Sequence, residues 1–232
     1  MAKKVETKKK TVKKETKKEN KKPVKKEVKV EKDKGLLFAI IGLVLIVVLA
    51  LVAILVPKSD EDKKSDTVLA IMTIKDYGDI VLELDRSNAP ITVDNFVNLA
   101  NSGFYDGLSF HRIIKGFMIQ GGDPDGDGYG GSSNTIKGEF EANGVKNKIS
   151  HVRGTISMAR STEYNSGSSQ FFIVQEDKTY LDGNYAAFGK VTSGMDIIDK
   201  VIEDFGTVED VTLEEGKRPI IEGIHIVEEV LE

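Results

Sequence analysis

The most conspicuous residues for chemistry in this sequence are three aspartates at alternate positions. Asp123, Asp125 and Asp127 lie in the stretch GGDPDGDGYGG, and a glycine follows the last of them, as in a calcium-binding loop. Such a loop needs a bidentate glutamate at its twelfth position, where this sequence has Asn134. No helical pattern flanks the stretch, and acidic residues and glycines are common in ordinary turns. We therefore expect neither a metal ion nor a cofactor, and keep a weak cation site as the alternative.

Other familiar catalytic sites lack essential parts. The sequence has no cysteine, which excludes a thiol nucleophile. Its three histidines, His111, His151 and His225, do not have the spacing of zinc ligands. The stretches GGSSN and SGSSQ do not match the Gly-x-Ser-x-Gly elbow of serine hydrolases, and the glycine-rich loop lacks the Lys-Ser or Lys-Thr of a phosphate-binding loop. The usual nucleophilic and metal-dependent chemistries are therefore not expected.

Four segments without an obvious nucleophile remain. They are FHRIIKGFMIQGGD at 110–123, SMAR at 157–160, GSSQFFI at 167–173 and YLDGNYAAFGKV at 180–191. Together they closely resemble the cyclophilin family of peptidyl-prolyl isomerases, and the resemblance runs from about residue 68 to residue 230.

The resemblance implies a role for each of ten residues. Arg112 matches the catalytic arginine, and Gln120 matches the residue that helps to hold it. The apolar pocket that receives the substrate proline is matched by Phe117, Met118, Phe172 and Leu181. Further positions around the bound substrate are matched by Ala159, Arg160, Gln170 and Tyr185. Spacing alone would make the aromatic and Met positions core residues and Arg112 a surface charge, so these roles depend on the resemblance.

The sequence departs from the family at three positions. Tyr180 stands where many eukaryotic cyclophilins have a tryptophan that contacts cyclosporin, so tight binding of that drug is not expected. Tyr185 replaces a frequent histidine, and Arg160 replaces a common asparagine at a point where the family uses main-chain groups. These choices look bacterial. We expect His111 to be structural, with its side chain on the opposite face of its strand from Arg112.

Two helices and many short strands must position these residues. TVLAIMTIKDYGDIVLELD predicts a hairpin around the turn Asp76-Tyr77-Gly78. APITVDNFVNLANSG has apolar residues at helical spacing, and SGMDIIDKVIE predicts a second helix capped by Ser193. Many short strands with only two helices favour a barrel. Together with the resemblance, this predicts a mainly β fold, an eight-stranded antiparallel closed β-barrel capped by two α-helices.

Residues 36–56 form an uninterrupted apolar run of 21 residues. As a helix, this run is roughly 30 Å long, the thickness of the bilayer hydrocarbon. The alternative, a cleaved signal peptide, has an apolar region of only about 7 to 15 residues behind a short basic start. Lysines crowd the boundary before the run, whereas basic and acidic residues alternate after it. This bias predicts a single-pass cell-membrane protein with a cytoplasmic N-terminus and an extracytoplasmic folded domain.

The chain therefore divides into four predicted parts. Residues 1–34 form a disordered tail with 16 lysines and 6 acidic residues, residues 35–57 a transmembrane helix, residues 58–66 a linker and residues 67–232 the isomerase domain. We expect the tail to act as a topology signal, with anionic lipid as an alternative partner and no nucleic acid. The folded domain is expected to be monomeric.

Two functions from different classes fit these observations. The first is a peptidyl-prolyl isomerase that acts on proline-containing polypeptides while exported or surface proteins fold. The second is a peptide-binding module or holdase chaperone that keeps the groove without turnover. The presence of both Arg112 and Gln120 favours the isomerase. Because the acidic loop follows the strand that carries Gln120, we also expect a modest preference for basic residues upstream of proline.

Overall fold

The structure is a computed structural model that describes residues 66–227 of the 232-residue chain. These residues fall within one compact unit, Asp62–Glu232. The predicted tail at 1–34, the predicted membrane helix at 35–57 and nearly all of the linker lie outside the described residues. Within residues 66–227, no helix is both long enough and apolar enough to cross a membrane.

The predicted hairpin at the start of the domain is confirmed. Strands β1 (Thr67–Ile74) and β2 (Gly78–Asp85) pair antiparallel, with Val68 opposite Leu84. Their buried side chains alternate with partly exposed ones, as expected for strands with one face on a core. Asp76 in the turn has a φ of 67°, a left-handed conformation that aspartate tolerates better than a branched residue does.

Both predicted helices are present, but the second begins differently. Helix α2 (Pro90–Asn101) buries one apolar stripe, and helix α3 (Met195–Phe205) follows a strand directly. Gly194, with a φ of 91°, is the N-cap residue of α3, so the prediction of Ser193 as the cap is wrong. Ser193 instead pairs with Val81 as the last residue of its strand.

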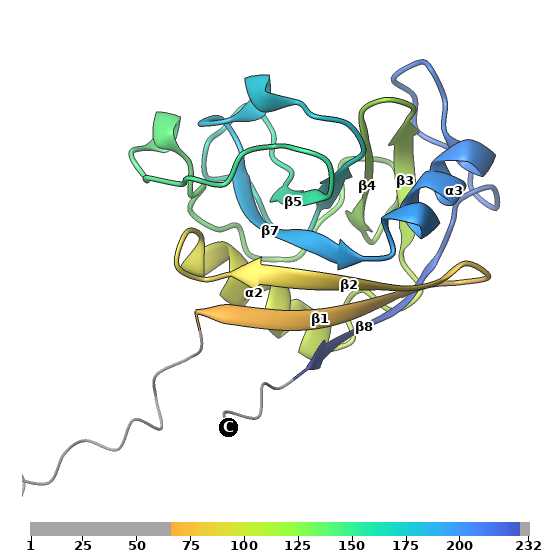
Figure 1. The fold of residues 1–232 in the computed structure, drawn as a ribbon, viewed down its shortest axis with the longest axis horizontal. Helices are drawn as coiled ribbons and strands as arrows, with labels where there is room; N and C mark the ends of the chain where they lie inside the picture. Colours follow the sequence, from red (N-terminus) through yellow and green to blue (C-terminus); the bar gives the residue numbers. More distant parts are fainter. Residues whose placement is uncertain (1–65, 228–232) are drawn as a thin grey trace, which may run out of the picture. The chain divides into compact units, whose positions relative to one another are not determined.

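Eight antiparallel strands form a single sheet, which confirms the predicted strand number and direction (Figure 1). Their order across the sheet is β3-β4-β6-β5-β7-β2-β1-β8. The remaining elements, in chain order, are β3 (Ser109–Ile114), β4 (Met118–Asp123), the 3₁₀ turn η2 (Glu141–Asn143), β5 (Thr155–Met158), β6 (Phe171–Val174), the 3₁₀ turn η3 (Thr179–Leu181), β7 (Ala186–Ser193) and β8 (Ile221–Val227).

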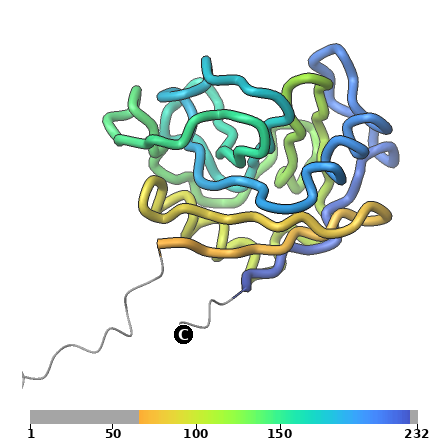
Figure 2. The backbone as a smooth tube through the Cα atoms, in the orientation of Figure 1, coloured from red at the N-terminus to blue at the C-terminus, as the bar shows by residue number. Residues whose placement is uncertain are grey.

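The sheet curls into a half-barrel whose two edge strands, β3 and β8, do not form a continuous ladder. They meet only at the start of each strand, where Ser109 bridges Ile220 and the Ile221 nitrogen donates to the Leu108 carbonyl at 2.7 Å. The segment between α3 and β8 lies along the outer edge of β3 instead, with bridges from Thr207 and Thr212 (Figure 2). Because this segment occupies the hydrogen-bonding edge of β3, the predicted closure of the barrel is incomplete.

Two apolar clusters lie on opposite faces of the sheet. The larger fills the inside of the half-barrel and contains the aromatic rings of α2, β3, β6 and β7. The smaller lies outside and includes Met118, Phe172 and Leu181. Because side chains alternate along a strand, Phe171 of β6 points into the larger cluster and Phe172 into the smaller. Strand alternation thus places apolar side chains on a face that would otherwise be solvated.

Candidate active site

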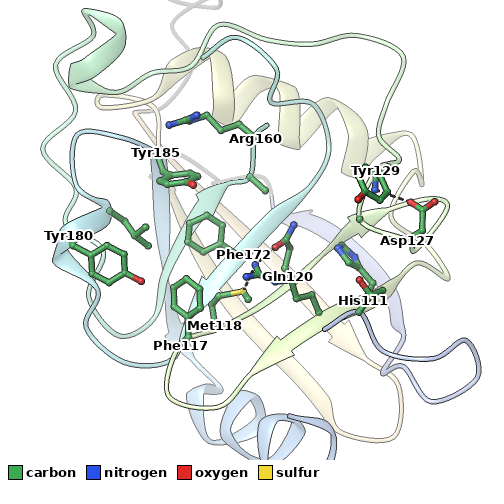
Figure 3. Close-up of a pocket in the computed structure, with 15 residues that line it drawn as sticks. His111, Phe117, Met118, Gln120, Asp127, Tyr129, Arg160, Phe172, Tyr180 and Tyr185 are labelled. Atoms are coloured by element: carbon green, nitrogen blue, oxygen red, sulfur yellow. Dashed lines mark hydrogen bonds between the residues drawn. The ribbon is translucent and has the colours of Figure 1, made fainter. Parts of the chain in front are cut away.

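A cavity of about 550 Å³ opens over β3, β4 and β6, on the side of the sheet that carries the smaller cluster (Figure 3). Nine of the ten residues that the resemblance predicted line this cavity. The tenth, Gln170, lines an adjoining hollow of about 440 Å³ that shares Gln120, Ala159 and Arg160 with the first. The structure therefore brings all ten predicted residues together around one groove, although it leaves their roles as predictions.

One side of the groove is apolar. We call it the apolar side and define it by five residues, Phe117, Met118, Phe172, Leu181 and Tyr185. Met118 and Phe172 are 1% and 5% exposed, and they come from the paired strands β4 and β6. The ring of Tyr185 meets the ring of Phe172 edge-on at 5.8 Å between centroids. This side has the size and polarity to hold a small apolar ring.

A buried histidine supports the apolar side from behind. The ring of His151 stacks on Phe172 at 6.0 Å, its Nδ1 lies 2.8 Å from Asp182 Oδ1, and its Nε2 lies 3.0 Å from Ser157 Oγ. Burial lowers the pKa of His151, against the opposing effect of Asp182. Serine hydrolases use the same order of contacts, but the side chain of Ser157 is fully buried and cannot reach a substrate. These three residues therefore form a structural support.

The other side of the groove is a chain of polar side chains, which we call the polar side: Arg112, Gln120, Gln170 and Asp210. Arg112 Nη1 donates to Gln120 Oε1 at 2.9 Å, and Gln120 Nε2 donates to Gln170 Oε1 at 2.8 Å. Gln170 Nε2 then donates to the main-chain carbonyls of Gly128 and Gly130, at 3.1 and 2.8 Å. The side-chain amides of Gln120 and Gln170 therefore each accept at Oε1 and donate from Nε2, and these bonds fix the orientation of both amides.

Arg112 also forms an ion pair that the sequence did not indicate. Its Nε lies 2.5 Å from Asp210 Oδ1, and its Nη2 lies 2.8 Å from Asp210 Oδ2. The hydrogen bonds from Arg112 hold the pKa of Asp210 below its usual range, against the opposing effect of burial. The guanidinium carbon is 5.9 Å from the centroid of the Phe117 ring, so the cation lies at the border between the polar and apolar sides.

Arg160 lines the groove, and its guanidinium makes several local contacts. Its Nε and Nη1 donate to main-chain carbonyls, at 3.0 Å to Asn184 and 2.8 Å to Ser161. The guanidinium also lies 4.7 Å from the centroid of the Tyr185 ring. The side chain of Arg160 therefore braces the rim of the groove.

The aspartates of the glycine-rich loop have separate tasks. Asp123 is buried and accepts hydrogen bonds from the main-chain nitrogens of Asp125 and Gly128, at 2.9 and 2.6 Å. It thus holds the loop closed, as Asx residues do in turns. Of the two exposed aspartates, Asp127 borders the groove and Asp125 does not. Across residues 66–227, no group of three or more His, Asp or Glu side chains could hold a metal ion.

His111 corrects a further prediction. The pairing of β3 with β4 shifts register between Phe110 and Arg112, so His111 is the extra residue of a bulge. It therefore lines the same groove as Arg112 and not the opposite face of the strand. Its side chain is 1% exposed, and among the described residues neither ring nitrogen has a hydrogen-bond partner. Burial lowers its pKa, and the positive charges of Arg218 and Arg112 act in the same direction, against the opposing charge of Asp123.

Six lining residues are not among the ten predicted ones: His111, Asp127, Gly128, Tyr129, Tyr180 and Thr212. Tyr129 is 94% exposed at the junction of the two hollows, and an aromatic residue in a glycine-rich loop is the one signal that could have indicated it. Thr212 and Asp210 come from the segment along β3, about 100 residues after Arg112 in the sequence, where no motif points to them.

Comparison with known proteins agrees with this geometry. Residues 69–228 match the family model described as cyclophilin type peptidyl-prolyl cis-trans isomerase. A peptidyl-prolyl cis-trans isomerase of Helicobacter pylori is 48% identical over 135 residues, which cover 57% of this chain and 80% of that protein. Peptidyl-prolyl cis-trans isomerase B of Bacillus subtilis is 50% identical over 123 residues, covering 53% and 82%.

A solved structure is also similar to this chain. A crystal structure of a cyclophilin type isomerase from Cryptosporidium parvum, obtained in the presence of the dipeptide Ala-Pro, has a TM-score of 0.61 and 32% identity. The match covers 69% of this chain and 99% of the other. The chain therefore belongs to the cyclophilin family and is a peptidyl-prolyl cis-trans isomerase.

Proposed function

We propose that Arg112 accelerates rotation about X-Pro bonds while the apolar side holds the proline ring. Rotation meets a barrier of about 18 to 20 kcal/mol because resonance gives the amide C–N bond partial double-bond character. No covalent bond has to break. A donor that hydrogen-bonds to the proline nitrogen as it becomes pyramidal withdraws the nitrogen lone pair from resonance. Such a donor stabilises the twisted state more than either planar state.

A fixed guanidinium at the edge of an apolar pocket is the observation that carries this proposal. Arg112 is permanently charged and planar, and Gln120 and Asp210 hold it from two directions. The pocket formed by Met118, Phe172 and Leu181 begins beside it. A proline ring bound there would remain still while the preceding carbonyl turns past the guanidinium. The site needs no nucleophile, metal or cofactor for this reaction.

The test is the Arg112→Ala variant in a protease-coupled isomerisation assay on a Pro-containing peptide. A hydrogen bond from a charged donor contributes roughly 1.5 to 3 kcal/mol, and each 1.36 kcal/mol is tenfold in rate. We expect kcat/KM to fall at least about tenfold with the domain still folded. Unchanged activity in this variant would contradict the mechanism. Peptide binding by the wild type without isomerisation would support the alternative, a binding module or holdase.

We further propose that the substrates are proline-containing segments of exported or surface proteins as they fold. The Ala-Pro dipeptide named with the Cryptosporidium parvum structure supports proline as the recognised residue. The acidic loop supports a modest preference for a basic residue upstream of proline, now through Asp127 alone, since Asp123 is buried and Asp125 does not line the groove.

The proposed location is outside the cytoplasmic membrane of a bacterium, in a monomeric domain anchored by residues 36–56. The apolar run and the lysine bias before it support this topology. The lysine-rich tail would then face the cytoplasm, where anionic lipid is its candidate partner. Protease added to intact cells should remove the isomerase domain, and full protection of the domain would contradict the proposed orientation.

A further inference from the structure

We infer that Asp210 is a positioning residue for the isomerisation reaction, acting through Arg112. The assignment rests on the proposed role of Arg112. Arg112 donates two parallel hydrogen bonds, from Nε and from Nη2, to the two carboxylate oxygens of Asp210. A two-point contact of this kind fixes the plane of the guanidinium as well as its position.

The donors of Arg112 can be counted. A guanidinium has five N–H groups. Asp210 takes the Nε–H and one Nη2–H, and Gln120 takes one Nη1–H. One N–H remains on each terminal nitrogen, and the one on Nη1 has only a weak acceptor, the Met118 sulfur at 4.0 Å. Gln120 alone would permit the group to rotate about its single contact. With Asp210 added, both remaining donors have fixed directions, as a donor aimed at a transition state requires.

Asp210 is itself held in place by its backbone. Its segment, residues 206–213, is attached to β3 on both sides of Asp210. On one side, the Thr207 nitrogen donates to the Ile113 carbonyl at 3.0 Å, and on the other the Leu213 nitrogen donates to the His111 carbonyl at 2.7 Å. These bonds lie on either side of Arg112 in β3, so the same part of the strand fixes both Arg112 and the segment that carries Asp210. The half-barrel edge that β8 leaves open is therefore used to position the carboxylate.

The contact has two possible electrostatic effects. The carboxylate could weaken catalysis by neutralising the guanidinium and competing with the substrate, or strengthen it by orientation. Orientation should dominate, because the side chain of Asp210 is 68% exposed and water screens its charge, whereas the geometry of the two hydrogen bonds persists. The same exposure makes the pair sensitive to ionic strength.

The test compares Asp210→Asn and Asp210→Glu with Glu209→Gln, a matched change of charge at the exposed neighbour in the same segment. With an uncharged Pro-containing peptide, Asp210→Asn should lower kcat about three- to fivefold with little change in KM, consistent with an exposed ion pair. Asp210→Glu should recover much of the loss, and Glu209→Gln should behave as wild type. About 1 M salt should slow the wild type but not Asp210→Asn.

Each other outcome overturns the assignment. A faster Asp210→Asn would show that the carboxylate competes with the substrate, and an equal loss in Glu209→Gln would show a general charge effect. If Arg112→Ala is inactive while Asp210→Asn is fully active, only this inference fails. If Arg112→Ala keeps its activity, the proposed mechanism fails and this inference with it. Hydrogen exchange at Arg112 Nε, followed by NMR, tests the pair without activity: it should be slower in the wild type than in Asp210→Asn, and equal rates would refute the pair in solution.

Discussion

The two sides of the groove are held by different forces. The apolar side is buried, and packing between adjacent strands fixes it: Met118 of β4 and Phe172 of β6 belong to one apolar cluster on the same face and are almost fully covered. The polar side is partly exposed, and side-chain hydrogen bonds between strands and loops fix it. Burial of an apolar side chain contributes more to stability than an exposed ion pair does. Substitutions on the apolar side should therefore reduce stability, and those on the polar side should mainly reduce the rate.

The largest effect is expected from Phe172→Ala. Phe172 is 5% exposed and packs against His151 and Tyr185, so its truncation leaves a cavity. The free energy of unfolding should fall by about 3 to 5 kcal/mol, measured by denaturant titration. Phe117→Ala, on the same side but only half-buried, is the control and should lower the free energy of unfolding by less. Equal losses would mean that burial does not distinguish these two rings.

Two buried histidines should make the stability of the domain depend on pH. Burial lowers the pKa of both His111 and His151 in the folded state. Between their usual pKa, near 6.5, and the lowered one, the unfolded chain therefore binds more protons than the folded domain. Stability from these residues is fully present above about pH 6.5 and falls as the pH is lowered, by at most about 1.4 kcal/mol per pH unit for each histidine.

His111→Leu tests this dependence directly. It removes a ring whose nitrogens have no partner among the described residues, so the unfolding free energy between pH 7 and 5 should vary less steeply than in the wild type. His225→Leu, at an exposed position on β8, is the control for the loss of a histidine. If the unfolding free energy of His111→Leu varied with pH as steeply as that of the wild type, His111 would not be a source of the acid sensitivity.

A change in the middle of the polar chain should reduce activity more than stability. Gln120→Met keeps the length of the side chain but removes both the acceptor for Arg112 and the donor to Gln170. We expect kcat/KM to fall about three- to tenfold, which corresponds to about 0.7 to 1.4 kcal/mol. The unfolding free energy should change by less than Phe172→Ala changes it. A stability loss as large as that of Phe172→Ala would remove the contrast between the two sides.

The smallest effect concerns the acidic loop. Peptides with Lys upstream of proline should be turned over about two- to fivefold better than peptides with Glu there, and Asp127→Asn should reduce this ratio toward one. Asp125→Asn changes the same charge in the same loop but away from the groove, so it should keep the ratio. A ratio of one in the wild type would dispose of the preference.

Much of the apolar side could be predicted from the sequence. Its residues lie in short continuous segments, and strand alternation decides which face each side chain takes, as Phe171 and Phe172 show. The hairpin and both helices could be predicted for the same reason, since their periodicity is local.

The unpredicted features depend on contacts between distant segments or on single backbone irregularities. Asp210 is one of several acidic residues after α3, and only the folded segment along β3 selects it as the partner of Arg112. The side of the sheet on which His111 lies depends on a bulge that no residue type in the sequence indicates. Ser193 does not cap α3 because it is still part of β7, where it pairs with Val81 of β2.

The pairing of β1 with β8 makes the domain a portable unit. Leu69 pairs with Val227, so the chain enters and leaves the described domain on neighbouring strands, whose paired Cα atoms lie about 5 Å apart. Neither strand lines the groove. The domain should therefore tolerate insertion into a surface loop of a host protein, or joining of its ends with new termini opened at the exposed turn near Asp76. Prolyl isomerisation could then be placed beside a chosen slow-folding segment without redesign of the site.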